Sequence, residues 1–129
     1  MSEHPEPHQL PALEEKVAYC VSLVEEKKAE EVLVFDLRDI SSVTDYFLLC
    51  HGSSGRQVQA IADHLLEMAK KRGLRPLGVE GYPEAQWILL DLGDLIVHVF
   101  YEETRRFYDL ERLWGHAPQV YPPHAKALT

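Results

Sequence analysis

QWILLDLGDLIVHVFYEETRRFYDLERLW, residues 86–114, carries the clearest structural pattern in this chain. Two apolar runs, at 87–90 and 95–100, flank a short polar break that contains Gly93, and a tight turn needs such a glycine. The pattern predicts a β-hairpin. Because both runs are almost continuously apolar, we expect cover on both faces of its strands.

A short amphipathic helix is predicted directly after the hairpin. Its first residues include Thr104, which suits an N-cap, and Gly115 and Pro118 can end it. The apolar positions at helical spacing are Phe107, Leu110, Leu113 and Trp114.

The preceding residues predict four further elements and an edge strand. A helical period begins at Leu13 and runs to Val24, and buried strands are expected at 32–36 and 46–51. A second helix follows the loop at 52–56 and stops at Gly73, and 74–80 can form an edge strand. This order predicts an α/β (α+β) fold, with a mixed sheet of about five strands and helices packed on it.

With 129 residues, of which 46% are hydrophobic, the chain is long enough for a single domain. We place that domain at 12–115. The proline-containing segments 1–11 and 116–129 are expected to be flexible tails.

Composition excludes several classes of function. Thirteen basic and twenty-one acidic residues give a formal net charge of −8, which argues against bulk attraction to phosphate and suits a basic partner. Cys20 and Cys50 lack zinc-ligand spacing, so we expect reduced core thiols. No apolar run approaches the roughly 18 residues of a membrane span. A soluble, cytoplasmic protein is predicted.

Four blocks of sequence resemble one known family. They are D-I-S-S-V-T-D-Y-F-L-L-C at 39–50, E-G at 80–81, W-I-L-L-D-x-G-D-x-I-V-H-V-F at 87–100, and R-x-F-Y-D-L-E-x-L-W at 105–114. In this order they resemble the ribosomal silencing factor, or Iojap-related, family over roughly residues 15–115. The resemblance implies a fold similar to the nucleotidyltransferase core. It also implies binding to the large ribosomal subunit through the basic ribosomal protein uL14, which would block joining of the small subunit and repress translation when nutrients are scarce.

The implied fold raises the alternative of a metal-dependent, nucleotidyltransferase-like enzyme. Gly52 and Ser53 could form a phosphate loop, but N-capping by Ser53 or Ser54 explains them more simply. No D-x-D or D-x-E pair follows, and Asp91 and Asp94 flank a turn that they can close. We therefore predict no enzymatic activity, no metal and no cofactor.

A recognition surface remains as the expected functional site. Aromatic residues gather in the C-terminal half, and the two tryptophans fit core packing and partner contact equally well. His98 lies in a buried strand pattern, where a hydrogen-bonded core histidine is commoner than a general base. The residues that match the family motif and are predicted to bind the partner are Trp87, Asp91, Asp94, His98, Tyr108, Glu111, Leu113 and Trp114.

The resemblance also implies a homodimer in the free state. If one apolar face serves both partners, dimerisation competes with ribosome binding. A contact with ribosomal RNA and a non-ribosomal interaction module stay open as further readings of the sequence.

Overall fold

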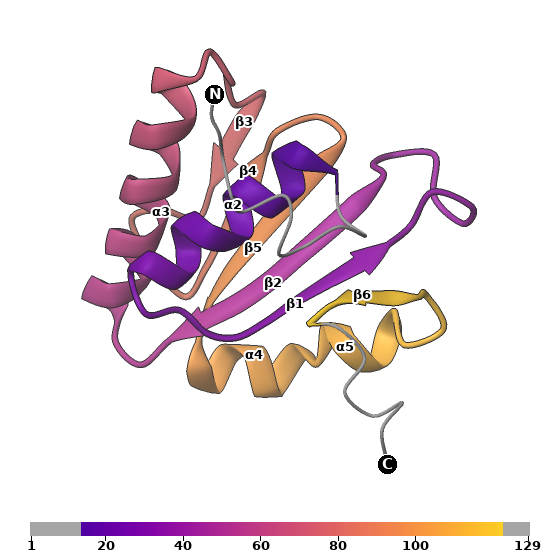
Figure 1. Cartoon of the computed structure of the whole chain (residues 1–129). Coiled ribbons are helices and arrows are strands. Elements are labelled where there is room, and N and C mark those ends of the chain that lie inside the picture. Colours follow the sequence, from indigo (N-terminus) through magenta and orange to yellow (C-terminus); the bar gives the residue numbers. More distant parts are fainter. Residues whose placement is uncertain (1–13, 123–129) are drawn as a thin grey trace.

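The computed structural model describes residues 14–122 as one sheet with helices on it (Figure 1). The helices are α2 (Glu15–Glu26), α3 (Gly55–Lys71), α4 (Glu102–Tyr108) and α5 (Leu110–Leu113). The strands are β1 (Glu30–Asp36), β2 (Tyr46–Gly52), β3 (Gly78–Glu80), β4 (Trp87–Asp91), β5 (Leu95–Tyr101) and β6 (Gln119–Tyr121). The predicted α/β class and the β4–β5 hairpin are confirmed.

The sheet has the strand order β3-β4-β5-β2-β1-β6. Its central pair, β2 and β5, is parallel, with Tyr46 opposite Leu95 at one end and Gly52 opposite Tyr101 at the other. Every other neighbouring pair is antiparallel. The sheet is therefore mixed, as predicted, and its innermost strand β5 is buried from Leu95 to Phe100.

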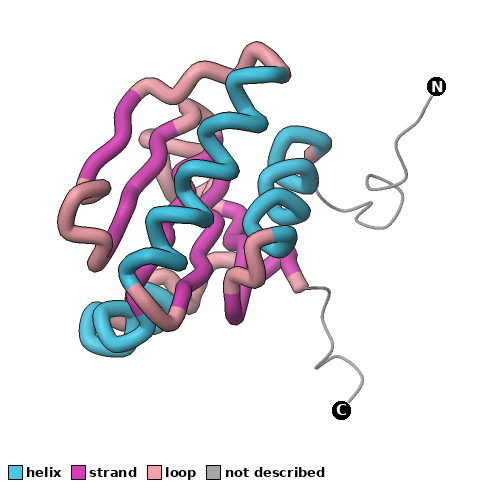
Figure 2. The backbone as a smooth tube through the Cα atoms, turned by 90° about the vertical axis from the view of Figure 1, so that its left-hand side faces the viewer, coloured by secondary structure: helices cyan, strands magenta, loops and turns pink. Residues whose placement is uncertain are grey.

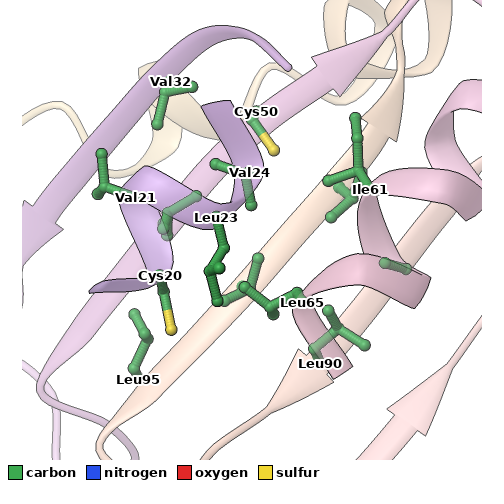
Figure 3. Close-up of a cluster of buried hydrophobic side chains, with 14 of the residues drawn as sticks. Cys20, Val21, Leu23, Val24, Val32, Cys50, Ile61, Leu65, Leu90 and Leu95 are labelled. Carbon is green, nitrogen blue, oxygen red and sulfur yellow. The ribbon is translucent and has the colours of Figure 1, made fainter. Parts of the chain in front are cut away.

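The larger core lies between one face of the sheet and the two long helices. Figure 2 shows α2 and α3 running side by side over the strands. Figure 3 shows the packing between them, where Leu23 of α2 and Leu65 of α3 point toward each other above the strands. Ser54 caps α3, as predicted, by accepting a hydrogen bond from the backbone N–H of Gln57 at 3.1 Å. Both cysteines are buried free thiols, and burial raises the pKa of each to about 12.

The predicted single helix after the hairpin is wrong. Asp109 has a left-handed backbone (φ 49°) and separates α4 from α5. Thr104 is not the N-cap, because β5 leads directly into α4 and Tyr101 takes that position. The Thr104 hydroxyl instead donates to Gln86 Oε1 at 2.8 Å.

Two predicted boundaries also differ. The edge strand is shorter than 74–80, because β3 pairs with β4 only over Gly78–Glu80. The segment assigned to a C-terminal tail from residue 116 contains β6, which pairs with β1 and adds a sixth strand to the predicted five. The other predicted tail, at 1–11, lies outside the described residues.

Gly81 sets the connection from β3 to β4. Its φ is +80°, and a Cβ built there would meet the carbonyl oxygen of Trp87. Only glycine avoids both the strain and the clash. Within residues 14–122, no helix is long and apolar enough to cross a membrane.

Candidate functional site

The second face of the sheet carries alternate residues of the hairpin. Trp87 and Leu89 of β4 lie opposite Phe100 and His98 of β5, while Ile88 between them points to the larger core. The expected cover on both faces holds for β5, but Trp87, Leu89 and Asp91 of β4 are only half-buried. This side of β4 is therefore open to a partner.

Aromatic rings run across this face from α5 to α4. The Phe47 ring lies 4.6 Å from His98 and 5.4 Å from Trp114, and the Trp87 ring lies 5.0 Å from Tyr108, between ring centroids. We call these five residues the aromatic face. It brings together four of the predicted partner-binding residues, namely Trp87, His98, Tyr108 and Trp114.

His98 is held by Trp87. The indole Nε1–H donates to His98 Nδ1 at 3.0 Å, which places the proton of a neutral imidazole on Nε2. His98 is 4% exposed, and burial lowers its pKa to about 4. Its Nε2 is buried and has no hydrogen-bond partner within the described structure. A hydrogen-bonded core histidine, one of the two predicted readings, fits this geometry.

Beyond the aromatic face, α4 and α5 expose large apolar side chains. Phe107 is 80% exposed, Tyr108 52% and Leu113 63%. Phe107 and Tyr108 stand between two grooves, one lined partly by Gln86 and Trp87 and the other crossing to α5. Apolar groups concentrated on so short a segment are typical of a protein-interaction surface.

A buried cation fixes α4 and α5 in place. Arg105 is 3% exposed, and its Nε donates to Glu111 Oε2 at 2.8 Å. Its Nη1 lies 3.0 Å from His51 Nδ1 and 3.4 Å from the carbonyl oxygen of Glu30. Glu111, which was predicted to bind a partner, is thus turned toward Arg105 in this structure.

Arg105 is not among the residues predicted for the site. In an unbroken helix, residues six positions apart project about 120° apart around the axis, so nothing in the sequence pairs Arg105 with Glu111. The break at Asp109 brings them together. The only available signal was the arginine at the start of the R-x-F-Y block.

Asp91 and Asp94 lie at the hairpin turn, away from α4. Asp91 Oδ1 accepts a hydrogen bond from the Gly93 backbone at 2.9 Å. Asp94 pairs with Lys16 Nζ at 2.7 Å, and the same ammonium group donates to the Leu92 carbonyl at 2.7 Å. These carboxylates close the turn and tie it to α2.

The glycine-serine loop is filled by a side chain. Gln57 Oε1 accepts from the Ser53 backbone N–H at 2.8 Å and from its hydroxyl at 3.2 Å. Gln57 Nε2 donates to the carbonyl oxygens of Lys27 and Lys28 at 3.3 and 3.0 Å. Groups that a phosphate would use are therefore already satisfied from within the chain.

The predicted alternative of a nucleotidyltransferase-like enzyme also fails on distance. Gly52 lies opposite Tyr101, whereas Asp94 immediately precedes Leu95 at the other end of the parallel pair. Six residue steps of about 3.3 Å separate the two ends by roughly 20 Å. Asp91 and Asp94 cannot hold a metal ion beside the loop.

Among residues 14–122, one group has ligand atoms close enough for a metal, namely Glu30, His51 and Glu102, all within 4.8 Å of one another. Arg105 donates to His51 Nδ1, so the His51 proton lies on Nε2 and faces Glu30 Oε1 at 3.2 Å. Glu102 accepts from Arg106 at 2.7 Å. Two guanidinium groups at this position favour an ion-pair network over a bound cation.

We expect Arg105→Ala to lower the free energy of unfolding by about 3 kcal/mol, because it leaves the polar groups of the network without their buried cation. Arg106→Ala is the matched control. Its exposed i,i+4 pair with Glu102 should be worth less than about 0.5 kcal/mol. Urea unfolding measures both variants, and equal losses would contradict the assigned role of Arg105.

His98 should make stability depend on pH. Its pKa is about 4 in the folded chain and 6.5 ordinarily, so between these values the unfolded chain binds the extra proton. Stability is then lost as the pH falls from 6.5 to 4, by about 3 kcal/mol. Unfolding at pH 7 and pH 4 should show this loss in the wild type beyond that of His98→Gln. Identical pH dependence in both proteins would show that His98 protonates freely when folded.

Sequence comparisons with known proteins lead to one family. A family model described as "Ribosomal silencing factor during starvation" matches residues 10–128. The ribosomal silencing factor RsfS of Bacillus subtilis is 50% identical over 94 residues, covering 73% of this chain and 80% of that protein. The RsfS of Halalkalibacterium halodurans is 47% identical over 107 residues, covering 83% and 92%.

Solved structures lead to the same family. A crystal structure of a protein from Bacillus halodurans superposes with a TM-score of 0.74 at 45% identity, covering 81% of this chain and 95% of that one. The matched relatives are named as silencing factors and not as enzymes, in agreement with the predicted lack of catalytic activity. Since the family model spans nearly the whole sequence, the chain belongs to the ribosomal silencing factor family.

Proposed function

We propose that this protein binds the large ribosomal subunit in the cytoplasm through ribosomal protein uL14. The aromatic face, extended by the exposed side chains of α4 and α5, is the contact surface. The observation that carries this proposal is the exposure of Phe107, Tyr108 and Leu113 next to a half-buried Trp87. Membership of the silencing factor family supports the ribosome as the target.

The composition of this surface suits a protein partner. Tyrosine and tryptophan supply large contact area and are enriched among residues that dominate binding energy. Trp87 is already fixed by its bond to His98, and Trp114 packs edge-on against Phe47, so few rotamers remain to be ordered on binding. Such pre-ordering favours a stable complex.

The net negative charge of the chain suits a basic partner, although it does not set the affinity of the complex. The chain carries −8, and Glu103 lines the groove beside Trp87 and Tyr108. The groove toward α5 is lined by Asp109 together with Arg106 and Arg112, so the acidic character lies on the Trp87 side. Exposed charges of this kind raise the association rate with a basic surface more than they strengthen the final complex. Apolar contacts from α4 and α5 would provide most of the affinity.

The proposed mechanism is steric and breaks no bond. A folded domain seated on uL14 at the intersubunit face occupies space that the small subunit needs. Joining is blocked while the complex lasts, and translation is repressed when nutrients are limiting. No residue of the protein needs to react.

Leu113→Ala should weaken binding to purified large subunits about tenfold, or 1.4 kcal/mol, because it removes an apolar contact from the proposed surface. Val43→Ala is the matched control, since Val43 is 76% exposed in the loop between β1 and β2, outside that surface. Co-sedimentation with large subunits measures both. Loss in Val43→Ala alone would move the contact to the β1–β2 loop, and failure of the wild type to sediment would favour a non-ribosomal module.

We also propose that the free protein forms a homodimer through the same surface, because water exposure of Phe107, Tyr108 and Leu113 is unfavourable. Binding of uL14 should then dissociate the dimer. Sedimentation velocity with increasing uL14 measures this, and the expected product is a complex with one copy of each protein. A complex that retains two copies of this chain would show that the two surfaces differ.

A further inference from the structure

A concentrated positive charge lies outside the surfaces described above. Residues 68–79 contain four cations and no acidic residue, namely Lys70, Lys71, Arg72 and Arg75. We call these four residues the basic cluster. Since the whole chain carries −8 and this segment +4, the remaining residues carry −12.

The basic cluster lies where α3 ends and the chain turns toward β3. Lys70 and Lys71 form the last turn of α3, Arg72 is its C-cap, and Arg75 follows in the loop. This end of α3 is opposite the end of the molecule where α4 lies (Figure 1). All four side chains are exposed, and within residues 14–122 none forms a salt bridge.

Helix capping explains only part of this charge. Cations favour the C-terminal end of a helix, but the last carbonyl groups of α3 already have partners. The Ala69 oxygen accepts from Arg72 and Leu74 at 3.0 and 2.9 Å, and the Lys70 oxygen accepts from Gly73 at 3.0 Å. Arg72 and Arg75 lie beyond the helix, and four neighbouring like charges repel one another.

One side chain of the basic cluster, Arg72, is held in place before any partner binds. The Arg72 guanidinium lies over the Tyr19 ring, 3.9 Å from its centroid. Lys70 and Arg75 line one groove together with Gly73 and Leu74. A Cβ at Gly73 would meet no atom within 4 Å, so the groove is open at this point. An anion in this groove would therefore meet both cations.

We propose that the basic cluster binds the phosphate backbone of RNA on the large ribosomal subunit. This inference rests on the proposed function, in which the opposite end of the protein is bound to a ribosomal protein. A ribosomal surface consists largely of RNA phosphates, and these repel a chain whose other residues carry −12. The basic cluster can face those phosphates favourably.

The test compares two variants of equal charge. The cluster variant is Lys70→Gln/Lys71→Gln/Arg75→Gln, which keeps Arg72 on Tyr19. The control variant is Lys27→Gln/Lys28→Gln/Arg56→Gln, which removes three exposed cations that form no salt bridge in the described structure. Each protein is titrated against purified large subunits at several salt concentrations and against isolated uL14, after circular dichroism confirms folding.

The cluster variant should bind large subunits about tenfold more weakly than wild type at low salt. Its plot of log affinity against log salt should be shallower by about 2 to 3, since each lost phosphate contact removes roughly 0.7 to 0.9 from the slope. The control variant should match wild type, and all three proteins should bind isolated uL14 equally.

Three results would overturn the inference. Equal weakening by the control variant would assign the effect to total charge, and weaker binding of the cluster variant to isolated uL14 would assign the contact to protein. An unchanged affinity of the cluster variant would exclude a contact. If wild type itself does not bind large subunits, the proposed function fails, whereas wild-type binding with an unchanged cluster variant overturns this inference alone.

Discussion

The pairing of Arg105 with Glu111 is the constraint on which the placement of α4 and α5 depends. A guanidinium group removed from water must be neutralised and hydrogen-bonded. Its partners come from α5, from His51 at the end of β2 and from the carbonyl of Glu30 at the start of β1. Few positions of α4 satisfy all three. The segment is therefore held against the end of the sheet by a polar network, in addition to the packing of Leu110 and Trp114 on the sheet.

This arrangement turns apolar residues outward. In one continuous helix, Phe107, Leu110 and Trp114 would share a single face and pack on the sheet. The left-handed Asp109 breaks that continuity. Leu110 and Trp114 remain packed on a second, smaller core, while Phe107 faces solvent. The buried residues of this smaller core are Phe35, Leu37, Leu49, Phe100 and Ala117. The polar network of Arg105 holds α4 and α5 on the sheet. Their exposed apolar side chains therefore remain available for an interface. The left-handed backbone at Asp109 thus exposes Phe107, which the helical spacing of the sequence would place in the core.

Sequence periodicity predicted the elements that bury large apolar areas, including the hairpin and the helix–sheet core, and the loop before α3 predicted a cap at Ser53 or Ser54. It could not predict β6, because three residues beside a proline carry too little pattern. It also failed at Asp109, where an unusual φ is set by tertiary contacts. For the site, the residues predicted from the motif include four of the five residues of the aromatic face, but not Phe47, Arg105 or the inward orientation of Glu111. Those depend on contacts between segments, which periodicity does not encode.

The remaining question is how an acidic protein approaches a surface rich in phosphate. Long-range repulsion acts on the net charge, whereas the final complex depends on local contacts. In the proposed complex, separation of charge would resolve the conflict, because +4 in one segment and −12 elsewhere would orient the chain before it touches the surface. An orientation with the basic cluster toward RNA would be favoured. The apolar residues of α4 and α5 would then act at short range, where they would slow dissociation. Electrostatic attraction would set the orientation of the protein on the large subunit, and burial of the apolar side chains of α4 and α5 would keep it bound.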